Sequence, residues 1–167
     1  MRLILGSDLH GHLPKDIPSG DIMILAGDIL PADDVRGFVR NKFHPWLQNA
    51  PVRNIVVTWG NHDWAPFNNS VSVCYAIVLV EKSVVINKVK IYGSPWSLPF
   101  REWAWMAPET TLEKIYRDMP EDVNVVVSHT PPYGICDQVS DGNFCGSRAL
   151  LNRIKSLSNL KLLVCGH

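Results

Sequence analysis

Side chains that can bind a metal ion recur at one kind of position along the chain. Short runs rich in Val, Ile and Leu are each followed, within a few residues, by Asp, Asn or His. Carboxylate and amide oxygens mixed with imidazole nitrogens, without thiolates, suit Mn²⁺, Fe or Zn²⁺. The polar residues that follow the five runs are Asp8 and His10, then Asp28, then Asn61, His62 and Asp63, then His129, and finally His167.

The number of these donors indicates two ions rather than one. Leaving Asp63 aside, seven groups are too many for one tetrahedral ion and suit a pair. A carboxylate such as Asp28 can bridge two cations about 3.5–4 Å apart, which clamp the attacking and leaving oxygens of a phosphoryl transfer. Such ions also lower the pKa of water from about 15.7 towards about 7, which generates a hydroxide nucleophile. The pattern therefore indicates metal-dependent hydrolysis of a phosphate ester.

The charge balance is consistent with this chemistry. Lys plus Arg and Asp plus Glu number 16 each, so the formal net charge is zero. A chain without a basic field does not attract nucleic acid or an anionic membrane, and neither is expected as a partner. The positive charge that a phosphate needs would come from the ions. The expected partner is a small phosphate ester, with nucleotides among the candidates.

The five apolar runs predict buried strands, and the chain between them predicts helices. Near-continuous apolar runs fit strands covered on both faces, as in α/β folds. Ligands of such sheets bind beyond the carboxyl ends of the strands, so we expect the polar residues to meet at one edge. Helical spacing runs from Val35 to Leu47, where Pro45 predicts a break or kink near His44.

Three further local signals indicate where elements begin or turn. Asn87-Lys88 lies between two strand-like runs and predicts a hairpin turn. The segment Thr110 to Glu113 has the pattern of a capping box that opens a helix. Another helix is expected to start near Ser147. The stretch around the hairpin contains strands alone, which predicts an antiparallel segment within the α/β fold.

The length and the cysteines indicate the class of protein. A chain of 167 residues with 46% hydrophobic content predicts one compact domain. The four cysteines form no C-x-x-C pair, which disfavours a disulfide framework and a thiolate zinc site. The apolar run at the N-terminus is too short for a signal peptide or a membrane span. These features predict a cytoplasmic protein with reduced thiols.

The order of the polar blocks resembles a known signature. Asp8-x-His10, Gly27-Asp28, Gly60-Asn61-His62-Asp63, Ser128-His129 and Gly166-His167 look like the blocks of the calcineurin-like metallophosphoesterases. The segments 91–96 and 128–134 are similar to the branch with class III cyclic-nucleotide phosphodiesterase-like and metallophosphoesterase-domain proteins. The resemblance implies a four-layer α/β/β/α sandwich with a dimetal site at the edge of its sheets.

The resemblance also implies a role for each matched residue. Asp8 and His10 would bind the first ion, Asp28 would bridge both, and Asn61, His129 and His167 would bind the second. His62 would hold a phosphoryl oxygen or protonate the leaving alkoxide. Asn61 would also contact the substrate, and Asp63 would either orient His62 or serve only as a helix cap.

Aromatic residues in loops could complete a substrate site. Trp96 and Tyr133 are expected to border it, where an aromatic face can stack on a nucleobase. Trp103 and Trp105 are expected to fill the core beneath their loop. Neither a G-x-S-x-G motif nor a Walker loop is present, so other common catalytic signatures are missing.

The chain departs from the family pattern at its last block. The family's block is G-H-x-H, whereas this sequence ends at His167. We therefore expect one metallophosphoesterase domain over residues 1–167 that is C-terminally incomplete and lacks its C-terminal strands. The leading interpretation is a phosphoesterase that acts on a phosphodiester, including a cyclic nucleotide, or on a small phosphomonoester. The alternative is a degenerate, catalytically weak nucleotide- or metal-binding protein that has lost one ligand.

Overall fold

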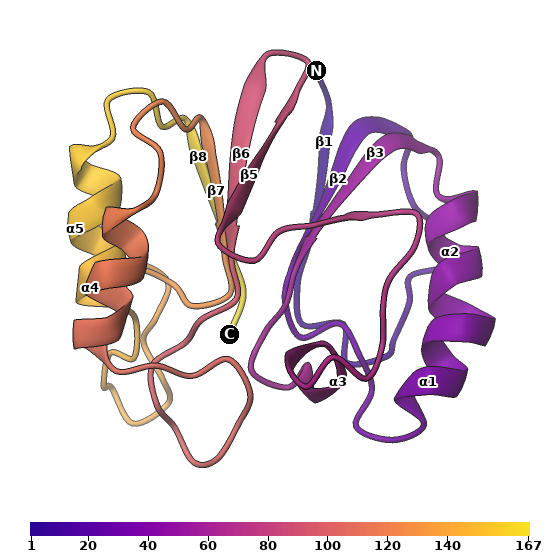
Figure 1. Cartoon of the computed structure of the whole chain (residues 1–167), viewed down its shortest axis with the longest axis horizontal. Coiled ribbons are helices and arrows are strands. Elements are labelled where there is room, and N and C mark those ends of the chain that lie inside the picture. Colours follow the sequence, from indigo (N-terminus) through magenta and orange to yellow (C-terminus); the bar gives the residue numbers. More distant parts are fainter.

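Two β-sheets face each other between two layers of helices. A computed structural model describes all 167 residues. Figure 1 shows the layers side by side, with α1 and α2 outside one sheet and α4 and α5 outside the other. The chain thus folds as the expected four-layer α/β/β/α sandwich. No helix is long and apolar enough to cross a bilayer.

The first sheet is entirely parallel. It contains β1 (Leu3–Gly6), β2 (Gly20–Ala26), β3 (Val52–Thr58) and β4 (Ile77–Val78), in that spatial order. The central strand β2 carries the near-continuous apolar run, and Met23 to Ala26 are all buried. Such a run is the pattern expected where a strand is covered on both faces.

The second sheet contains the predicted hairpin. Its strands are β5 (Lys82–Ile86), β6 (Val89–Ser94), β7 (Val125–Ser128) and β8 (Leu162–Cys165), in that spatial order. Strands β5 and β6 are antiparallel, and the remaining neighbours are parallel. Asn87 and Lys88 both have positive φ, 50° and 67°, as a type I′ turn requires. The hairpin prediction is therefore confirmed.

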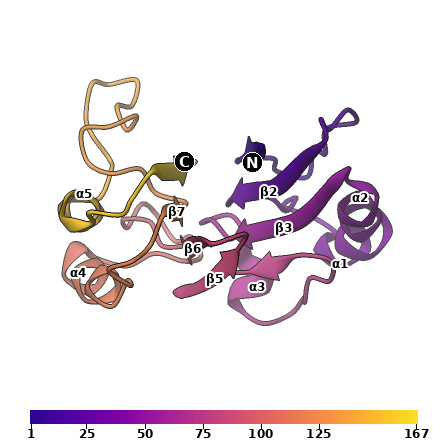
Figure 2. The same ribbon diagram turned by 90° about the horizontal axis from the view of Figure 1, so that it is seen from above.

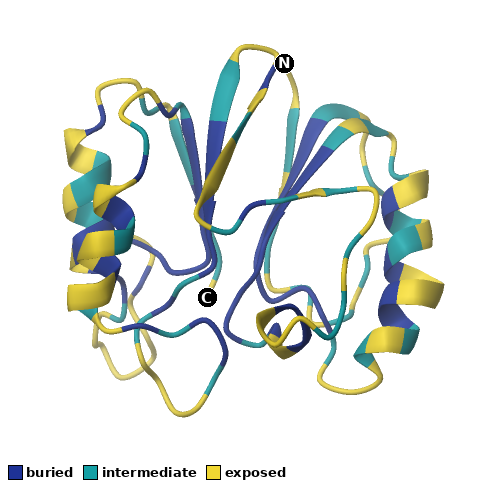
Figure 3. Cartoon of the chain, in the orientation of Figure 1, coloured by how far each residue is buried: buried dark blue, intermediate teal, exposed yellow.

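The core between the sheets is formed by branched aliphatic side chains. Figure 3 shows buried residues concentrated in the facing strands, with exposed residues on the outer sides of the helices. Residues from both sheets share one cluster that includes Ile24, Val56, Ile91 and Val127, each fully buried. Burying such a side chain stabilises the fold by about 1.5–3 kcal/mol. This core fixes the two sheets relative to each other and therefore fixes the loops at their edges.

The break predicted at Pro45 is absent, and the chain remains helical through this residue. The helical segment runs without interruption through α1 (Val35–Phe38), the π-helical turn η1 (Val39–Phe43) and α2 (His44–Asn49). Pro45 lies in the first turn of α2, where its missing N–H costs least. The wider turn before it lets the N–H of His44 donate to the carbonyl of Val39, so the helix absorbs the proline.

The two helices over the second sheet begin in different ways. α4 (Glu109–Arg117) starts one residue before the predicted capping box, after Pro108, and no side chain caps it. The capping-box prediction is therefore wrong, because Thr110 lies inside the helix and is not its N-cap. Glu109 accepts hydrogen bonds from the first turn of α5 (Arg148–Ser156). Ser147 caps α5 through the N–H of Leu150, as predicted.

The loops that follow the parallel strands of both sheets lie at one end of the sandwich. In Figure 1 these loops lie in the lower half, and the C-terminus lies between the two sheets there. Figure 2 shows β8 next to the start of the chain, so the outer strands β1 and β8 lie on the same side. The short helix α3 (Trp64–Phe67) follows the loop after β3. The polar residues singled out in the sequence lie in these loops.

Candidate metal centre

Backbone hydrogen bonds join the loops that carry the candidate ligands. The N–H of Asp8 donates to the carbonyl of Gly27, and the N–H of His10 donates to the carbonyl of Asp28, both at 2.9 Å. The loop after β8 is joined to the loop after β7, because the N–H of Gly166 donates to the carbonyl of His129 at 3.1 Å. Segments far apart in the sequence are therefore held together at one edge of the sandwich.

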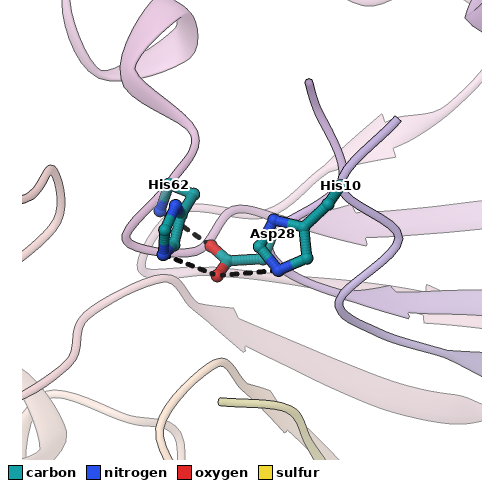
Figure 4. Close-up of side chains that lie close together, drawn as sticks. All are labelled: His10, Asp28 and His62. Atoms are coloured by element: carbon teal, nitrogen blue, oxygen red, sulfur yellow. Dashed lines mark hydrogen bonds and ion pairs between the residues drawn. The ribbon is translucent and has the colours of Figure 1, made fainter. Parts of the chain in front are cut away.

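Asp28 lies at the centre of the cluster, and its two oxygens face different groups. Figure 4 shows Oδ2 directed at two imidazoles, with the Nε2 atom of His10 at 3.8 Å and that of His62 at 3.9 Å. The other oxygen, Oδ1, lies 3.4 Å from the Nε2 atom of His129. Asp28 is only 3% exposed. Two groups of side chains lie close enough together to hold a metal ion, His10–Asp28–His62 and Asp8–Asp28–His129. Asp28 is the one residue that belongs to both.

His129 is oriented by the backbone so that one ring nitrogen faces the cluster. Its ring is fully buried, and its Nδ1 lies 2.9 Å from the carbonyl oxygen of Ala26. Because a carbonyl can only accept, Nδ1 carries the proton. Nε2 faces the Oδ1 atom of Asn61, 3.0 Å away, and the Oδ1 atom of Asp28, 3.4 Å away. It donates to these acceptors when the ring carries both protons, and its lone pair faces the same point when the ring is neutral. A backbone partner of this kind typically orients a metal-binding histidine.

The electrostatics of this pair indicate a place for positive charge. Burial alone would lower the pKa of His129, but the hydrogen bond and negative charge of Asp28 outweigh it and raise that pKa above its usual value. Burial alone would likewise raise the pKa of Asp28, but the hydrogen bond to His129 holds it below its usual value. The pair therefore favours an ionised carboxylate beside a protonated imidazole.

Asp8 and His167 complete the side of the cluster next to His129. The carboxylate of Asp8 accepts hydrogen bonds from the N–H of His167, at 3.2 and 3.3 Å. The ring of His167 lies 5.0 Å from that of His129, centroid to centroid. Asp8 thus groups with His129 and Asp28, whereas the family resemblance implies that it shares an ion with His10. Which ion Asp8 binds stays a prediction.

Three candidate ligands in the loops after β1 and β2 have an unusual backbone conformation, and His167, with a φ of 72°, shares it. The φ angles of Asp8, His10 and Asp28 are 55°, 44° and 52°, in the left-handed region that non-glycine residues rarely adopt. This conformation costs roughly 1–2 kcal/mol per residue. Such strain persists only where the surroundings impose it, and it clusters at functional sites. Here it turns successive side chains of two loops towards the same point.

Two glycines leave the space that the ligands occupy. Gly27 has a φ of +92°, and a Cβ there would lie 2.8 Å from Cγ of His129 and 2.8 Å from the carbonyl oxygen of Trp59. At Gly60 a Cβ would lie 2.5 Å from the backbone nitrogen of Asp28 and 2.6 Å from Cε1 of His129. Any larger residue at either position would displace Asp28 or His129.

His62 faces the cluster from the loop after β3 and is held by a tryptophan. Its own N–H donates to Oδ1 of Asp28 at 2.8 Å, and its side chain is 38% exposed. Its ring lies 4.1 Å from the ring of Trp103, tilted by 33°, and 4.9 Å from the ring of His10 at a right angle. The imidazole is therefore positioned on two sides and still reachable from solvent.

The sequence predicts Trp103 in the core, whereas the structure places its ring against His62. Its loop is fixed on both sides of it: the N–H of Ala104 donates to the carbonyl of Asn61 at 3.0 Å, and the indole of Trp105 donates to the carbonyl of Asp63 at 3.2 Å. Trp105 is buried, as expected. Nothing local in the sequence distinguishes the two tryptophans, because the difference arises from a contact with a distant loop.

Asp63 connects two loops of the cluster. Its buried carboxylate accepts hydrogen bonds from the N–H groups of Ile29 at 3.1 Å, Leu30 at 2.9 Å and Gly60 at 2.9 Å. Burial raises its pKa to about 6, although these three donors favour the ionised form. It makes no hydrogen bond to the ring of His62 and no side-chain cap on α3. Asp63 therefore holds the loop that carries Asp28 against the loop that carries Asn61 and His62.

With this geometry in hand, comparison with known proteins identifies the family. A family model described as calcineurin-like phosphoesterase matches residues 1–167. The chain belongs to the calcineurin-like phosphoesterase family. The resemblance of the polar blocks to this family is thereby confirmed.

Relatives of this calcineurin-like phosphoesterase include proteins from animals. It is 29% identical to "Metallophosphoesterase domain-containing protein 1" of Homo sapiens over an alignment 201 residues long. The alignment covers 99% of this chain and 60% of the relative. It is 30% identical to a "UPF0046 protein" of Caenorhabditis elegans over 194 residues, which cover 100% of this chain and 68% of the relative. The chain thus spans about 60% of the length of the human protein.

The donor set of this calcineurin-like phosphoesterase fits divalent metal ions. The family typically binds such ions, and the two groups that share Asp28 each bring ligand atoms within 4.8 Å of one another. Imidazole nitrogen and carboxylate oxygen are ligands of Zn²⁺, Fe and Mn²⁺. His10 and Oδ2 of Asp28 could hold one ion, and His129, Asn61 and Oδ1 of Asp28 could hold the other.

The two aromatic residues expected at the substrate site have other partners. The indole N–H of Trp96 donates to a carboxylate oxygen of Glu81, and its ring packs edge-on against Trp105 at 5.5 Å. The ring of Tyr133 lies 3.5 Å below the guanidinium of Arg148. Neither makes a hydrogen bond or ring contact with a candidate ligand in the structure. Their role in binding a nucleobase stays a prediction.

Proposed function

We propose that this chain hydrolyses phosphate esters at a pair of divalent ions bridged by Asp28. The observation that carries the proposal is the division of the Asp28 carboxylate, with Oδ2 facing His10 and His62 and Oδ1 facing His129. Bound divalent ions would supply a water of lowered pKa and the positive charge that a phosphate needs. Membership of the calcineurin-like phosphoesterase family supports the same reaction class.

Different side chains around Asp28 would bind the two ions. His10 would hold an ion on the Oδ2 side, while Asn61 and His129 would hold one on the Oδ1 side. His167 would contribute its ring to the second ion. The mixture of nitrogen and oxygen donors suits Mn²⁺, Fe or Zn²⁺.

His62 acts on the substrate rather than on the ions. Its ring is 38% exposed, so it can reach a bound ester, whereas the ring of His129 is fully buried. As a general acid it would donate a proton to the leaving alkoxide, a contribution of about 10²–10⁴-fold in rate. Trp103 fixes the plane of the imidazole, which keeps the donating nitrogen directed at the cluster.

The substrate is a small phosphate ester. A phosphodiester, including a cyclic nucleotide, or a small phosphomonoester fits a site whose positive charge comes from ions instead of a basic surface. The zero formal net charge supports a small substrate over a long nucleic acid, which needs a basic track along its backbone.

Hydrolysis of bis-p-nitrophenyl phosphate tests the proposal. With added Mn²⁺ the chain should release p-nitrophenolate above background, and EDTA or the substitution Asp28→Asn should abolish the release. Mn²⁺ binding without hydrolysis of this diester or of p-nitrophenyl phosphate would contradict the enzymatic proposal. That result would favour the alternative, a degenerate protein that binds metal or nucleotide without turnover.

A further inference from the structure

An apolar cavity opens beside the candidate metal centre, next to His167. It has a volume of about 430 Å³ and is lined by Leu98, Pro99, Phe100, Val139, Cys145 and His167. Its walls come from the loop after β6 and the loop after β7, which lie at the same end of the second sheet as His129. His167 is the only imidazole in the lining, and its ring lies 5.0 Å from the ring of His129.

The walls of this cavity are accessible. The side chain of Phe100 is 60% exposed and Val139 is 43% exposed, although both are large and hydrophobic. A hydrophobic group that enters the cavity would cover this surface and remove it from water, which is favourable at about 25 cal/mol per Å². The cavity is therefore suited to a hydrophobic group attached to whatever binds at the metal centre.

A second cavity, on the His10 side of the cluster, has the opposite character. It has a volume of about 320 Å³ and is lined by ten residues, of which only Phe38 is hydrophobic apart from prolines and glycines. Its polar lining includes His10, His12, Asp33 and Lys42. A phosphate bound at the cluster would thus meet polar side chains on one side and hydrophobic side chains on the other.

We propose that the cavity beside His167 binds an aromatic or aliphatic substituent of the phosphate-ester substrate. This inference rests on the proposed function, and it names the substrate class as esters that carry one hydrophobic group. The ring of His167 links the two sites, because it lies 5.0 Å from the ring of His129 and also forms part of the cavity wall. The cavity would act in binding alone and would take no part in the chemical step.

Two diesters with the same leaving group test this inference. Methyl p-nitrophenyl phosphate and phenyl p-nitrophenyl phosphate both release p-nitrophenolate, so they differ only in the group that stays on phosphorus. We measure kcat/KM for each with the Mn²⁺-loaded chain. The ratio for phenyl over methyl should fall about 10-fold in Phe100→Ala and in Val139→Ser, because the hydrophobic wall is removed. Intrinsic reactivity cancels, because only the change in ratio between variants is compared.

A matched control uses a similar residue outside the cavity. Phe67 is 41% exposed and lies in α3, away from the cavity lining. Phe67→Ala should leave the ratio unchanged. Calorimetry with phenylphosphonate and methylphosphonate provides a readout without turnover: the wild type should bind phenylphosphonate more tightly, and Phe100→Ala should reduce that preference.

The outcomes separate this inference from the proposed function. Hydrolysis of both diesters with a ratio that Phe100→Ala does not change would overturn the inference and leave the phosphoesterase proposal intact. The chain could instead hydrolyse neither diester but bind phenylphosphonate more tightly than methylphosphonate, with the preference lost in Phe100→Ala. That result would support the proposed binding site in the cavity and would count against the proposed phosphoesterase activity. Equal binding of the two phosphonates by the wild type would overturn the inference, and would indicate that the cavity is covered by something other than the ligand.

Discussion

The Nε2 atom of His129 lies 3.4 Å from Oδ1 of Asp28. Two ligands that are each about 2.1 Å from one tetrahedral ion are separated by about 3.4 Å. The pair is therefore spaced for joint binding of an ion, with the imidazole already in the required tautomer because Nδ1 donates to the carbonyl of Ala26. Both side chains are buried, so this spacing is fixed by the fold.

Gly27→Ala should weaken metal binding through His129. The new Cβ would lie 2.8 Å from Cγ of that histidine and would displace its ring. Displacing the environment of a ligand typically costs 10–100-fold in metal affinity. Gly142→Ala is the matched control, because its φ of +88° is close to the +92° of Gly27 but a Cβ there meets no atom within 4 Å. Calorimetric titration with Mn²⁺ should show a loss for Gly27→Ala alone; equal losses would indicate general strain instead.

His62→Ala should separate catalysis from metal binding. Removing the proton donor should lower kcat by about 10²–10⁴-fold, while metal content stays near that of the wild type. Parallel measurement of diester hydrolysis and of bound metal checks this. If metal is lost together with activity, His62 is a ligand, as its position within the His10–Asp28 group would also allow.

Trp103→Ala should lower activity without removing metal. The indole lies 4.1 Å from the ring of His62, and its loss would let the imidazole rotate. We expect kcat to fall about 10–100-fold, because small misplacements of a catalytic group have effects of this size. Trp103→Phe should recover most of that loss by restoring a ring. Trp64→Ala, an exposed tryptophan on α3, serves as the control and should leave kcat unchanged.

Asp63→Ala should destabilise the fold as well as the site. Three buried N–H groups, on Ile29, Leu30 and Gly60, would lose their acceptor. Each such loss costs about 1–3 kcal/mol, so the free energy of unfolding should fall by at least about 3 kcal/mol. Urea denaturation measures this. Asp122→Asn, which removes an exposed ion pair with Lys90, should shift the curve far less, and equal shifts would refute the role given to Asp63.

The strands and the placement of the ligands could be predicted because they follow from local patterns. Five apolar runs define strands, and the next polar residues fall at the carboxyl ends whatever the details of the loops. Burial was predicted correctly for β2, β3 and β7 but not for the edge strands β1 and β8, where Leu5 of β1 is 49% exposed. The hairpin was predictable for the same reason, because Asn87-Lys88 can take up the turn that the two runs require. These features depend on neighbours in the sequence.

The features that could not be predicted depend on distant contacts. Pro45 is accommodated by the π-helical turn before it, which no propensity indicates. α4 begins at Glu109, before the predicted capping box, and Glu109 accepts hydrogen bonds from the start of α5. Trp103 and Trp105 both contact the loop after β3, Trp103 through the ring of His62 and Trp105 through the carbonyl of Asp63. Two of the three partners of Asp63, Ile29 and Leu30, lie in a loop more than thirty residues away.

Metal stoichiometry tests the central claim most directly. The chain, loaded with Mn²⁺ and freed of excess ion by gel filtration, is analysed by inductively coupled plasma mass spectrometry beside Asp28→Ala and the control Asp118→Ala, an exposed residue at the end of α4. Sharing of the Asp28 carboxylate predicts two ions per chain in the wild type and in the control, and fewer than one in Asp28→Ala. One ion or none in the wild type, or an unchanged content in Asp28→Ala, would contradict a bridged pair.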